Sequence, residues 1–66
     1  MQVMINGKAE EVVEGSVLDL LKAKNIEPQM VAVEVNDQMV ERTNLGTTPL
    51  KEGDQVEFLF YMGGGR

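Results

Sequence analysis

Hydrophobic and polar residues alternate with a period of two at the start of the chain. Within residues 1–5 the odd positions carry Met, Val and Ile and fall on one side of an extended chain, whereas the even positions fall on the other. This pattern is typical of a β-strand. Asn6-Gly7 follows, and this dipeptide favours a tight hairpin turn because both turn positions need a positive φ. We therefore expect a β-hairpin whose returning strand covers residues 8–13, with Val12 or Val13 directed inward.

The hydrophobic period changes to that of a helix after residues 14–16. Apolar residues recur at i, i+3 and i+4 and form one apolar helix face: Val17, Leu20 and Leu21. Ser16 is suited to the N-cap, and Asp19 three residues later completes a capping box in which Asp replaces the usual Glu. Pro28 cannot continue the helix. We therefore expect one short helix over residues 16–25, whose apolar face belongs to the core.

A second group of strands is predicted in the second half of the chain. Valines alternate with other residues over 31–35, Asn36-Asp37 forms a turn, and residues 38–41 return as a short strand. Residues 43–49 form an irregular connection, whose composition fits a brief strand or a 3₁₀ turn near Thr47, Pro49 and Leu50. The last strand covers residues 55–61, where one face carries Val56, Phe58 and Phe60 and the other carries Gln55, Glu57, Leu59 and Tyr61.

These elements predict an α+β fold. A last strand placed between the two hairpins, parallel to the first strand, pairs its backbone groups and leaves the helix to cover one sheet face. The result is a mixed four- to five-stranded sheet with one main helix packed on one face, which is by analogy the β-grasp, or ubiquitin-like, architecture. We expect a single domain over residues 1–62. We also expect a flexible Gly-rich C-terminal tail over residues 63–66, because glycine has no side chain to bury and is costly to order.

The composition disfavours most self-contained enzyme chemistry. The 66 residues include no cysteine and no histidine, so the chain lacks disulfides, thiolate metal ligands and the usual general base. We expect no catalytic residue, no metal site and a monomer in isolation. The formal charge of −5, from 11 acidic and 6 basic residues, disfavours nucleic-acid binding, which needs a basic surface. No apolar run approaches the roughly 20 residues of a membrane span, and no secretory signal opens the chain, so we expect a cytoplasmic protein without membrane contact.

The glycines near the end of the chain, Gly63, Gly64 and Gly65, allow two interpretations. A backbone without Cβ atoms can thread a slot that other residues would block. In one interpretation the tail presents a terminal carboxyl group to the active site of another protein. In the other it is a frayed terminus without a function, which is common at chain ends.

Long stretches of the chain follow the pattern of a known family. The matching segments cover nearly the whole chain without a sizeable gap and comprise residues 2–7, 15–21, 31–33, 35–36, 48–50, 53–57 and 62–65, together with Val40 and Arg42. With these segments the chain resembles the ThiS family, the sulfur carriers of thiamine biosynthesis. Glu41 and Leu45 depart from the Pro and Trp that family members often carry there. Arg66 is the larger departure, because carriers of this class normally end at glycine.

The resemblance implies a carrier protein rather than an enzyme. An E1-like adenylyltransferase, similar to ThiF, would use ATP and Mg²⁺ to adenylate the carboxylate of Gly65 after a peptidase removes Arg66. Sulfur from a cysteine desulfurase relay would then replace AMP, and the resulting thiocarboxylate would pass its sulfur to a thiazole synthase similar to ThiG. Gly63 and Gly64 belong to the same site. The chain itself would bind no cofactor, since ATP and Mg²⁺ belong to the activating partner.

Partner binding is predicted on and beside the last strand. Leu59, Tyr61 and Met62 are expected to form a partly exposed apolar patch next to the tail, where the activating enzyme and the thiazole synthase dock in turn. The alternative is that these side chains pack under the connection at residues 43–49.

Acidic residues of the same region are expected to guide a partner. Glu57 and Asp54 lie on or beside the last strand, and they would steer a basic partner surface by electrostatic attraction. The alternative for each is a solvated acidic face that only keeps the protein soluble.

Three other functions stay open at this point. The chain could carry sulfur for another pathway, such as molybdopterin or cysteine synthesis. It could also be a β-grasp module that binds proteins, or a modifier joined to lysines through its terminal glycine, with no sulfur role.

Overall fold

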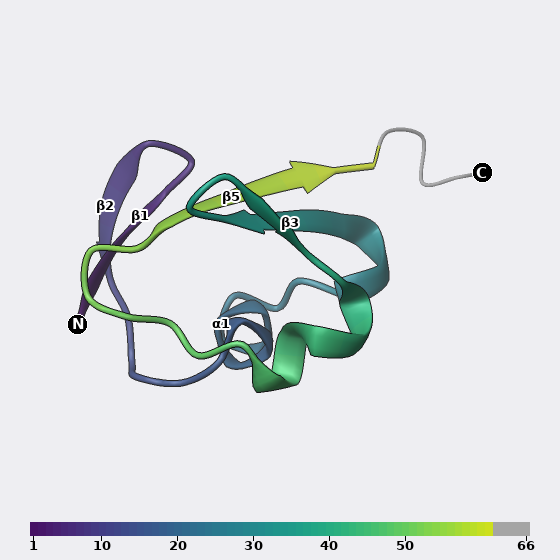
Figure 1. Ribbon diagram of the computed structural model, residues 1–66, viewed down its shortest axis with the longest axis horizontal. Coiled ribbons are helices and arrows are strands. Elements are labelled where there is room, and N and C mark those ends of the chain that lie inside the picture. Colours follow the sequence, from purple (N-terminus) through teal and green to yellow (C-terminus); the bar gives the residue numbers. More distant parts are fainter. Residues whose placement is uncertain (62–66) are drawn as a thin grey trace.

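The computed structural model describes residues 1–61, and Figure 1 shows a β-sheet with one helix packed on one face. The strands are β1 (Gln2–Ile5), β2 (Lys8–Glu11), β3 (Val31–Val35), β4 (Gln38–Val40) and β5 (Gln55–Phe60). The helix is α1 (Val17–Ala23), and the 3₁₀ helices are η1 (Pro28–Met30) and η2 (Arg42–Thr47). The elements follow one another along the chain in the predicted order.

Strand β5 lies at the centre of the sheet, between the two hairpins. The strand order is β2-β1-β5-β3-β4. β5 runs parallel to β1 and antiparallel to β3, with Val56 beside Ile5 and Phe58 beside Val33. Val56 therefore pairs with a strand on each side, whereas residues 58–60 pair with β3 alone. The predicted α+β fold, a mixed five-stranded sheet with one main helix in the β-grasp arrangement, is confirmed.

The first hairpin turns at Asn6-Gly7, as predicted. Both residues have a positive φ, 49° and 84° respectively. The returning strand is shorter than predicted, because β2 ends at Glu11 and does not reach residue 13. Val12 packs against the core, whereas Val13 is 88% exposed. The chain leaves the edge of the sheet here to reach the start of α1, so the strand cannot continue.

Helix α1 begins with the predicted capping box. The Ser16 hydroxyl accepts a hydrogen bond from the Asp19 N–H at 3.1 Å, and the Asp19 carboxylate accepts one from the Ser16 N–H at 2.9 Å. At the other end Asn25 adopts the left-handed conformation, with a φ of 60°, that commonly ends a helix. The helix spans Val17–Ala23, which lies within the predicted residues 16–25.

The capping box makes the stability of the domain depend on pH. The backbone N–H of Ser16, and secondly its hydroxyl, lower the pKa of Asp19 below its ordinary value of 3.8. Because the folded-state pKa is the lower one, the charged carboxylate stabilises the fold above pH 3.8. This contribution is lost as the pH falls through the folded-state value. We expect Asp19→Asn to lower the thermal midpoint at neutral pH and to match the wild type at a pH well below 3.8.

Thermal unfolding followed by circular dichroism across this pH range measures the difference. Asp37→Asn is the matched control: it removes one carboxylate from an exposed turn, and Asn tolerates the positive φ of 69° at that position. A difference between the wild type and Asp19→Asn that stays constant across the range would contradict the role given to the carboxylate charge.

One core lies between α1 and the covered face of the sheet. Its most deeply buried large side chains are Val3, Val17, Leu21, Val33 and Val56. η2 closes one end of this core with Leu45, which is 3% exposed, and Gly46 lies against the Leu18 side chain. The predicted irregular connection is therefore a 3₁₀ segment on the helix side of the sheet. The opposite face carries no other element of the described chain (Figure 1).

Candidate functional site

Strand β5 carries the chain from the centre of the sheet toward the predicted tail. The strand ends at Phe60, and the N–H of Tyr61 donates a hydrogen bond to the Met30 carbonyl at 3.1 Å. This hydrogen bond joins the last described residue, Tyr61, to the residue that directly precedes β3. The remaining site residues of the prediction lie outside the described residues: Met62, Gly63, Gly64, Gly65 and Arg66. What was expected of them stays a prediction.

The face of the sheet opposite α1 carries exposed apolar side chains near the end of β5. Ala32 pairs with Leu59 across β3 and β5, and Met39 extends the apolar surface onto β4. Leu59 is 52% exposed, Tyr61 54% and Met39 56%. We call these four residues, Ala32, Met39, Leu59 and Tyr61, the open-face patch.

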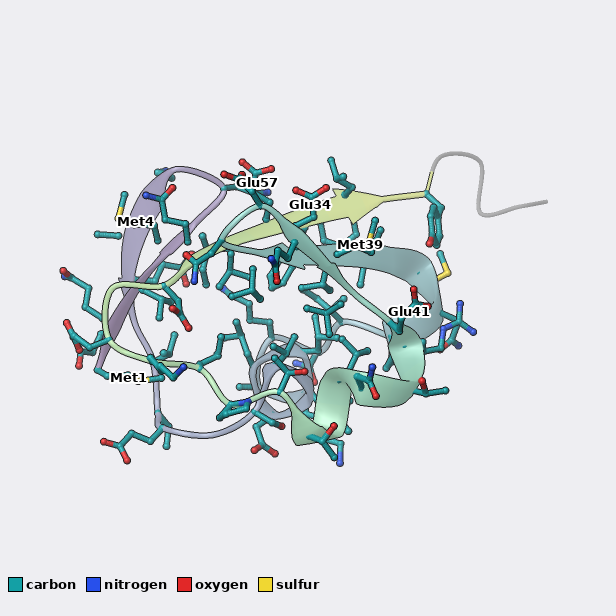
Figure 2. The ribbon with its side chains drawn as sticks, in the orientation of Figure 1. Met1, Met4, Glu34, Met39, Glu41 and Glu57 are labelled. Atoms are coloured by element: carbon teal, nitrogen blue, oxygen red, sulfur yellow. The ribbon has the colours of Figure 1, made fainter. Side chains whose placement is uncertain are left out.

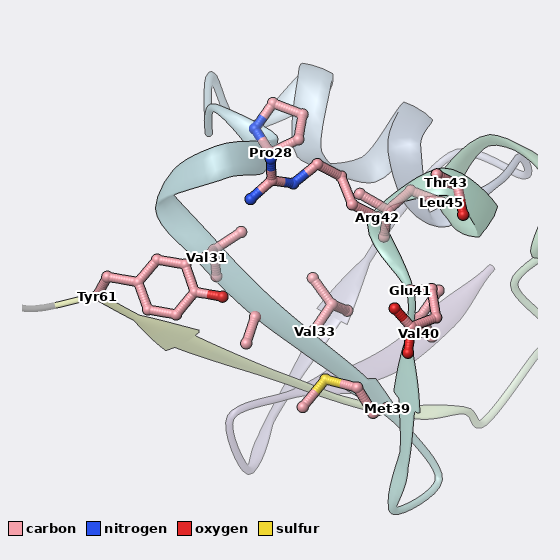
Figure 3. A pocket seen from close by; sticks show the side chains of 11 residues that line it. Pro28, Val31, Val33, Met39, Val40, Glu41, Arg42, Thr43, Leu45 and Tyr61 are labelled. Carbon is pink, nitrogen blue, oxygen red and sulfur yellow. The ribbon is translucent and has the colours of Figure 1, made fainter.

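The connection at residues 43–49 does not cover Leu59. It packs on the helix side of the sheet, where Leu45 belongs to the core, and Leu59 on the other side stays half exposed. Tyr61, unlike Leu59, lines a hollow of about 410 Å³ together with Arg42 and Thr43, so it lies closer to the connection than Leu59 does (Figure 3). Leu59 and Tyr61 are therefore accessible to a partner, and their role in partner binding stays a prediction.

Phe60 is exposed although the strand pattern placed it on the core side. Its side chain is 54% exposed and contacts Phe58 edge to face, with the ring centroids 6.3 Å apart. Figure 1 shows α1 below the earlier part of β5 and away from the end of the strand, so the helix does not cover Phe60. Exposed apolar surface therefore lies on both sides of β5 where the chain leaves the sheet.

The two predicted acidic residues lie at different places along β5. Glu57 is on the open face, directly across from Glu34 on β3 (Figure 2). Asp54 precedes the strand, and both of its carboxylate oxygens accept hydrogen bonds within the chain, from Asn36 Nδ2 at 3.0 Å and from the Lys51 N–H at 2.8 Å. The structure brings Glu57 close to the open-face patch and gives Asp54 a role in closing a turn. Partner binding by either residue stays a prediction.

Two asparagines position β5, and the sequence pattern assigned both only to turns. Asn6 Oδ1 accepts a hydrogen bond from the Phe58 N–H at 2.8 Å, and Asn6 Nδ2 donates to the Phe58 carbonyl at 3.4 Å. Asn36 Oδ1 accepts from the Gln55 N–H at 3.0 Å. The two hairpin turns thereby fasten the last strand, Asn36 at its first residue and Asn6 at Phe58. Turn composition does not reveal such bonds, because Asn6 and Phe58 are 52 positions apart.

The described residues offer neither a metal site nor a membrane-spanning helix. Residues 1–61 contain no group of three or more His, Cys, Asp or Glu side chains arranged to hold a metal ion. Among these residues, no helix combines the length and the apolar character needed to cross a bilayer. The exposed side chains around the end of β5 are the strongest candidate for a functional surface.

Comparison with protein families identifies the chain. The sequence pattern of the ThiS family matches residues 3–65. The chain belongs to the ThiS family. The resemblance seen in the sequence is therefore confirmed, and the match includes Gly63, Gly64 and Gly65.

Solved ThiS structures share this fold. The crystal structure of the thiamine biosynthesis protein (ThiS) from Geobacter metallireducens is 39% identical, with a TM-score of 0.85 over 98% of this chain and 100% of that chain. A solution structure of a thiamine biosynthesis protein from the same organism is 38% identical, with a TM-score of 0.82 over 100% of this chain and 90% of that chain. Family and structures together support a sulfur-carrier role in thiamine synthesis.

A longer protein also contains a segment similar to this ThiS-family chain. A thiazole synthase from Magnetococcus marinus is 36% identical over 67 residues, which comprise 100% of this chain and 21% of that protein. The chain therefore spans about a fifth of the length of this curated relative.

Proposed function

We propose that this ThiS-family chain carries sulfur as a thiocarboxylate on Gly65 for the thiazole moiety of thiamine. The observation that carries the proposal is the family match over residues 3–65, which extends to the glycine at the proposed terminus. The chain then acts as a carrier and co-substrate of partner enzymes, not as a catalyst. Its own contribution to the chemistry is a terminal carboxylate at the end of a segment of three glycines.

The chemistry needs an activating enzyme because a carboxylate is a poor electrophile. An E1-like adenylyltransferase similar to ThiF joins the Gly65 carboxylate to the α-phosphate of ATP and releases pyrophosphate. Mg²⁺ bound by that enzyme neutralises the phosphate charge. AMP is a good leaving group, so a persulfide formed by a cysteine desulfurase relay displaces it and gives an acyl disulfide. A thiol then reduces this disulfide and releases the thiocarboxylate. A thiocarboxylate is a nucleophile at neutral pH and passes its sulfur to the thiazole.

The glycine segment fits this use because it has no Cβ atoms. Gly63 and Gly64 allow the chain to enter a channel too narrow for other residues, so that the Gly65 carboxylate reaches the nucleotide. Arg66 has to leave first. A peptidase that hydrolyses the peptide bond between Gly65 and Arg66 supplies the functional terminus.

Two enzymes dock in turn on the open-face patch, the activating enzyme and a thiazole synthase similar to ThiG. The exposure of Leu59 and Tyr61 at the end of β5 supports this assignment, because a partner seated there also receives the tail. The thiazole synthase with a segment similar to this chain supports the second partner. We place the reaction in the cytoplasm, where ATP is available.

The proposal predicts the exchange of one oxygen for one sulfur on the terminal carboxyl group. Most of the chain ending at Gly65 should gain the mass difference between sulfur and oxygen when it is incubated with its activating enzyme, ATP, Mg²⁺, a cysteine desulfurase, cysteine and a thiol reductant. Mass spectrometry of the C-terminal peptide locates the change, and a reaction without ATP is the control. A chain that returns unchanged, or joined to a lysine of another protein, would contradict the carrier function.

A further inference from the structure

Two glutamates face each other on the open side of the sheet. Glu34 on β3 and Glu57 on β5 are direct partners in the antiparallel register. Figure 2 shows both side chains on the side of the sheet away from the helix. Like charges directly opposite each other on neighbouring strands destabilise a sheet. The facing pair therefore lowers the stability of the free chain.

No cation within residues 1–61 forms a salt bridge with this pair. The salt bridges in this part of the chain join the amino group of Met1 to Glu11, and Lys24 to Glu10. Both involve the other edge of the sheet, where β2 lies. The facing glutamates are thus an unfavourable cross-strand pair that no salt bridge within residues 1–61 offsets. Unfavourable local pairs of this kind are expected at functional surfaces.

The glutamate pair borders the open-face patch. Met39 lies across from Glu34 on β4, and Leu59 follows Glu57 on the same face of β5. A protein that covers Met39 and Leu59 also removes water from the two carboxylates. Burying carboxylates without a partner cation is strongly unfavourable, so a protein that docks here must bring a positive charge.

We propose that Glu34 and Glu57 together bind an arginine side chain of the activating enzyme, while Met39 and Leu59 contact an apolar side chain beside that arginine. The inference rests on the proposed function and specifies the surface by which the activating enzyme recognises the carrier. A guanidinium group presents five N–H donors in a planar fork and is more weakly hydrated than an ammonium group. It therefore suits two neighbouring carboxylates inside a protein interface.

The charge of this face disfavours a second copy of the chain as the occupant. A symmetric dimer formed through the open-face patch would place one glutamate pair near another. The net charge of −5 adds to this repulsion. A basic partner surface is attracted instead, and its association slows as salt screens the attraction.

Neutralising the pair tests the inference. The test variant is E34Q/E57Q and the control variant is E14Q/E27Q, both in chains ending at Gly65. Each variant removes two negative charges, and the control residues Glu14 and Glu27 are exposed and lie outside the sheet. E34Q/E57Q should unfold at a higher temperature than the wild type, because the repulsion is gone. Its Kd for the activating enzyme should rise on the order of 30-fold, with a weaker dependence on salt.

The control variant and the wild type decide the interpretation. E14Q/E27Q should keep its Kd within about threefold of the wild type, as expected of surface substitutions outside the interface. Equal affinities of the wild type and E34Q/E57Q would overturn the inference, and so would a loss of affinity that E14Q/E27Q shares. A lower thermal midpoint of E34Q/E57Q would overturn the claim that the pair strains the sheet. A wild-type chain that is not adenylated at all would overturn the proposed function as well.

Discussion

A chain ending at Gly65 is expected to support pyrophosphate exchange into ATP at least about 100-fold faster than a chain ending at Arg66, with the same activating enzyme. In the proposed reaction the terminal carboxylate must lie against the α-phosphate of ATP. Arg66 moves this carboxylate along the chain by up to ~3.6 Å and adds a long charged side chain at the innermost point. A misplacement of about 1 Å is already enough to slow a reaction by roughly 100-fold.

Two more chains separate the effect of length from that of the arginine side chain. Arg66→Gly keeps the extra residue without the side chain, and a chain ending at Gly64 is one residue short. Both displace the carboxylate, so both should exchange slowly. Equal exchange by the chains ending at Gly65 and Arg66 would show that no peptidase is needed and that Gly65 is not the functional terminus.

Leu59→Glu is expected to raise the Kd for the activating enzyme about 30-fold or more while the domain stays folded. Leu59 is 52% exposed, so its replacement leaves the core between α1 and the sheet unchanged. The new carboxylate would lie in an apolar contact and close to Glu57, and both effects oppose docking. Calorimetric titration measures the affinity, and the thermal midpoint reports the fold.

Val13→Glu is the matched control for this variant. Val13 is an apolar residue with 88% exposure, and it follows β2 at the opposite edge of the sheet from β4. The control adds the same charge far from the open-face patch and should bind the activating enzyme as the wild type does. Normal binding by Leu59→Glu, or its unfolding, would contradict the docking role of the open-face patch.

The order and type of the elements could be predicted because their signals are local. The capping box of Ser16 and Asp19 and the turn at Asn6-Gly7 each lie within a few residues of sequence. The end of β2 at Glu11 depends instead on where the chain must go to begin α1. The composition left open whether the connection forms a brief strand or a 3₁₀ turn, and the packing of Leu45 into the core goes with the 3₁₀ form and its bounds at Arg42–Thr47. Both are tertiary effects that no short sequence window contains.

The candidate site was predictable only in part, for a related reason. Alternation along β5 placed Leu59 and Glu57 on the open face, where the structure has them. The position of Glu34 opposite Glu57 depends on the register between β3 and β5, which the alternation within one strand does not specify. The exposure of Phe60 depends on where α1 packs along the sheet, and the hydrogen bonds between Asn6 and Phe58 depend on the parallel pairing of β1 and β5.

The mass of the C-terminal peptide, measured on the chain isolated from cells that make thiamine, tests most directly whether Gly65 carries sulfur. We expect a peptide that ends at Gly65, with a fraction bearing a thiocarboxylate. This fraction should disappear when the gene for the activating enzyme is deleted. A peptide that ends at Arg66 with an ordinary carboxylate in every molecule, in cells that are synthesising thiamine, would contradict the carrier function.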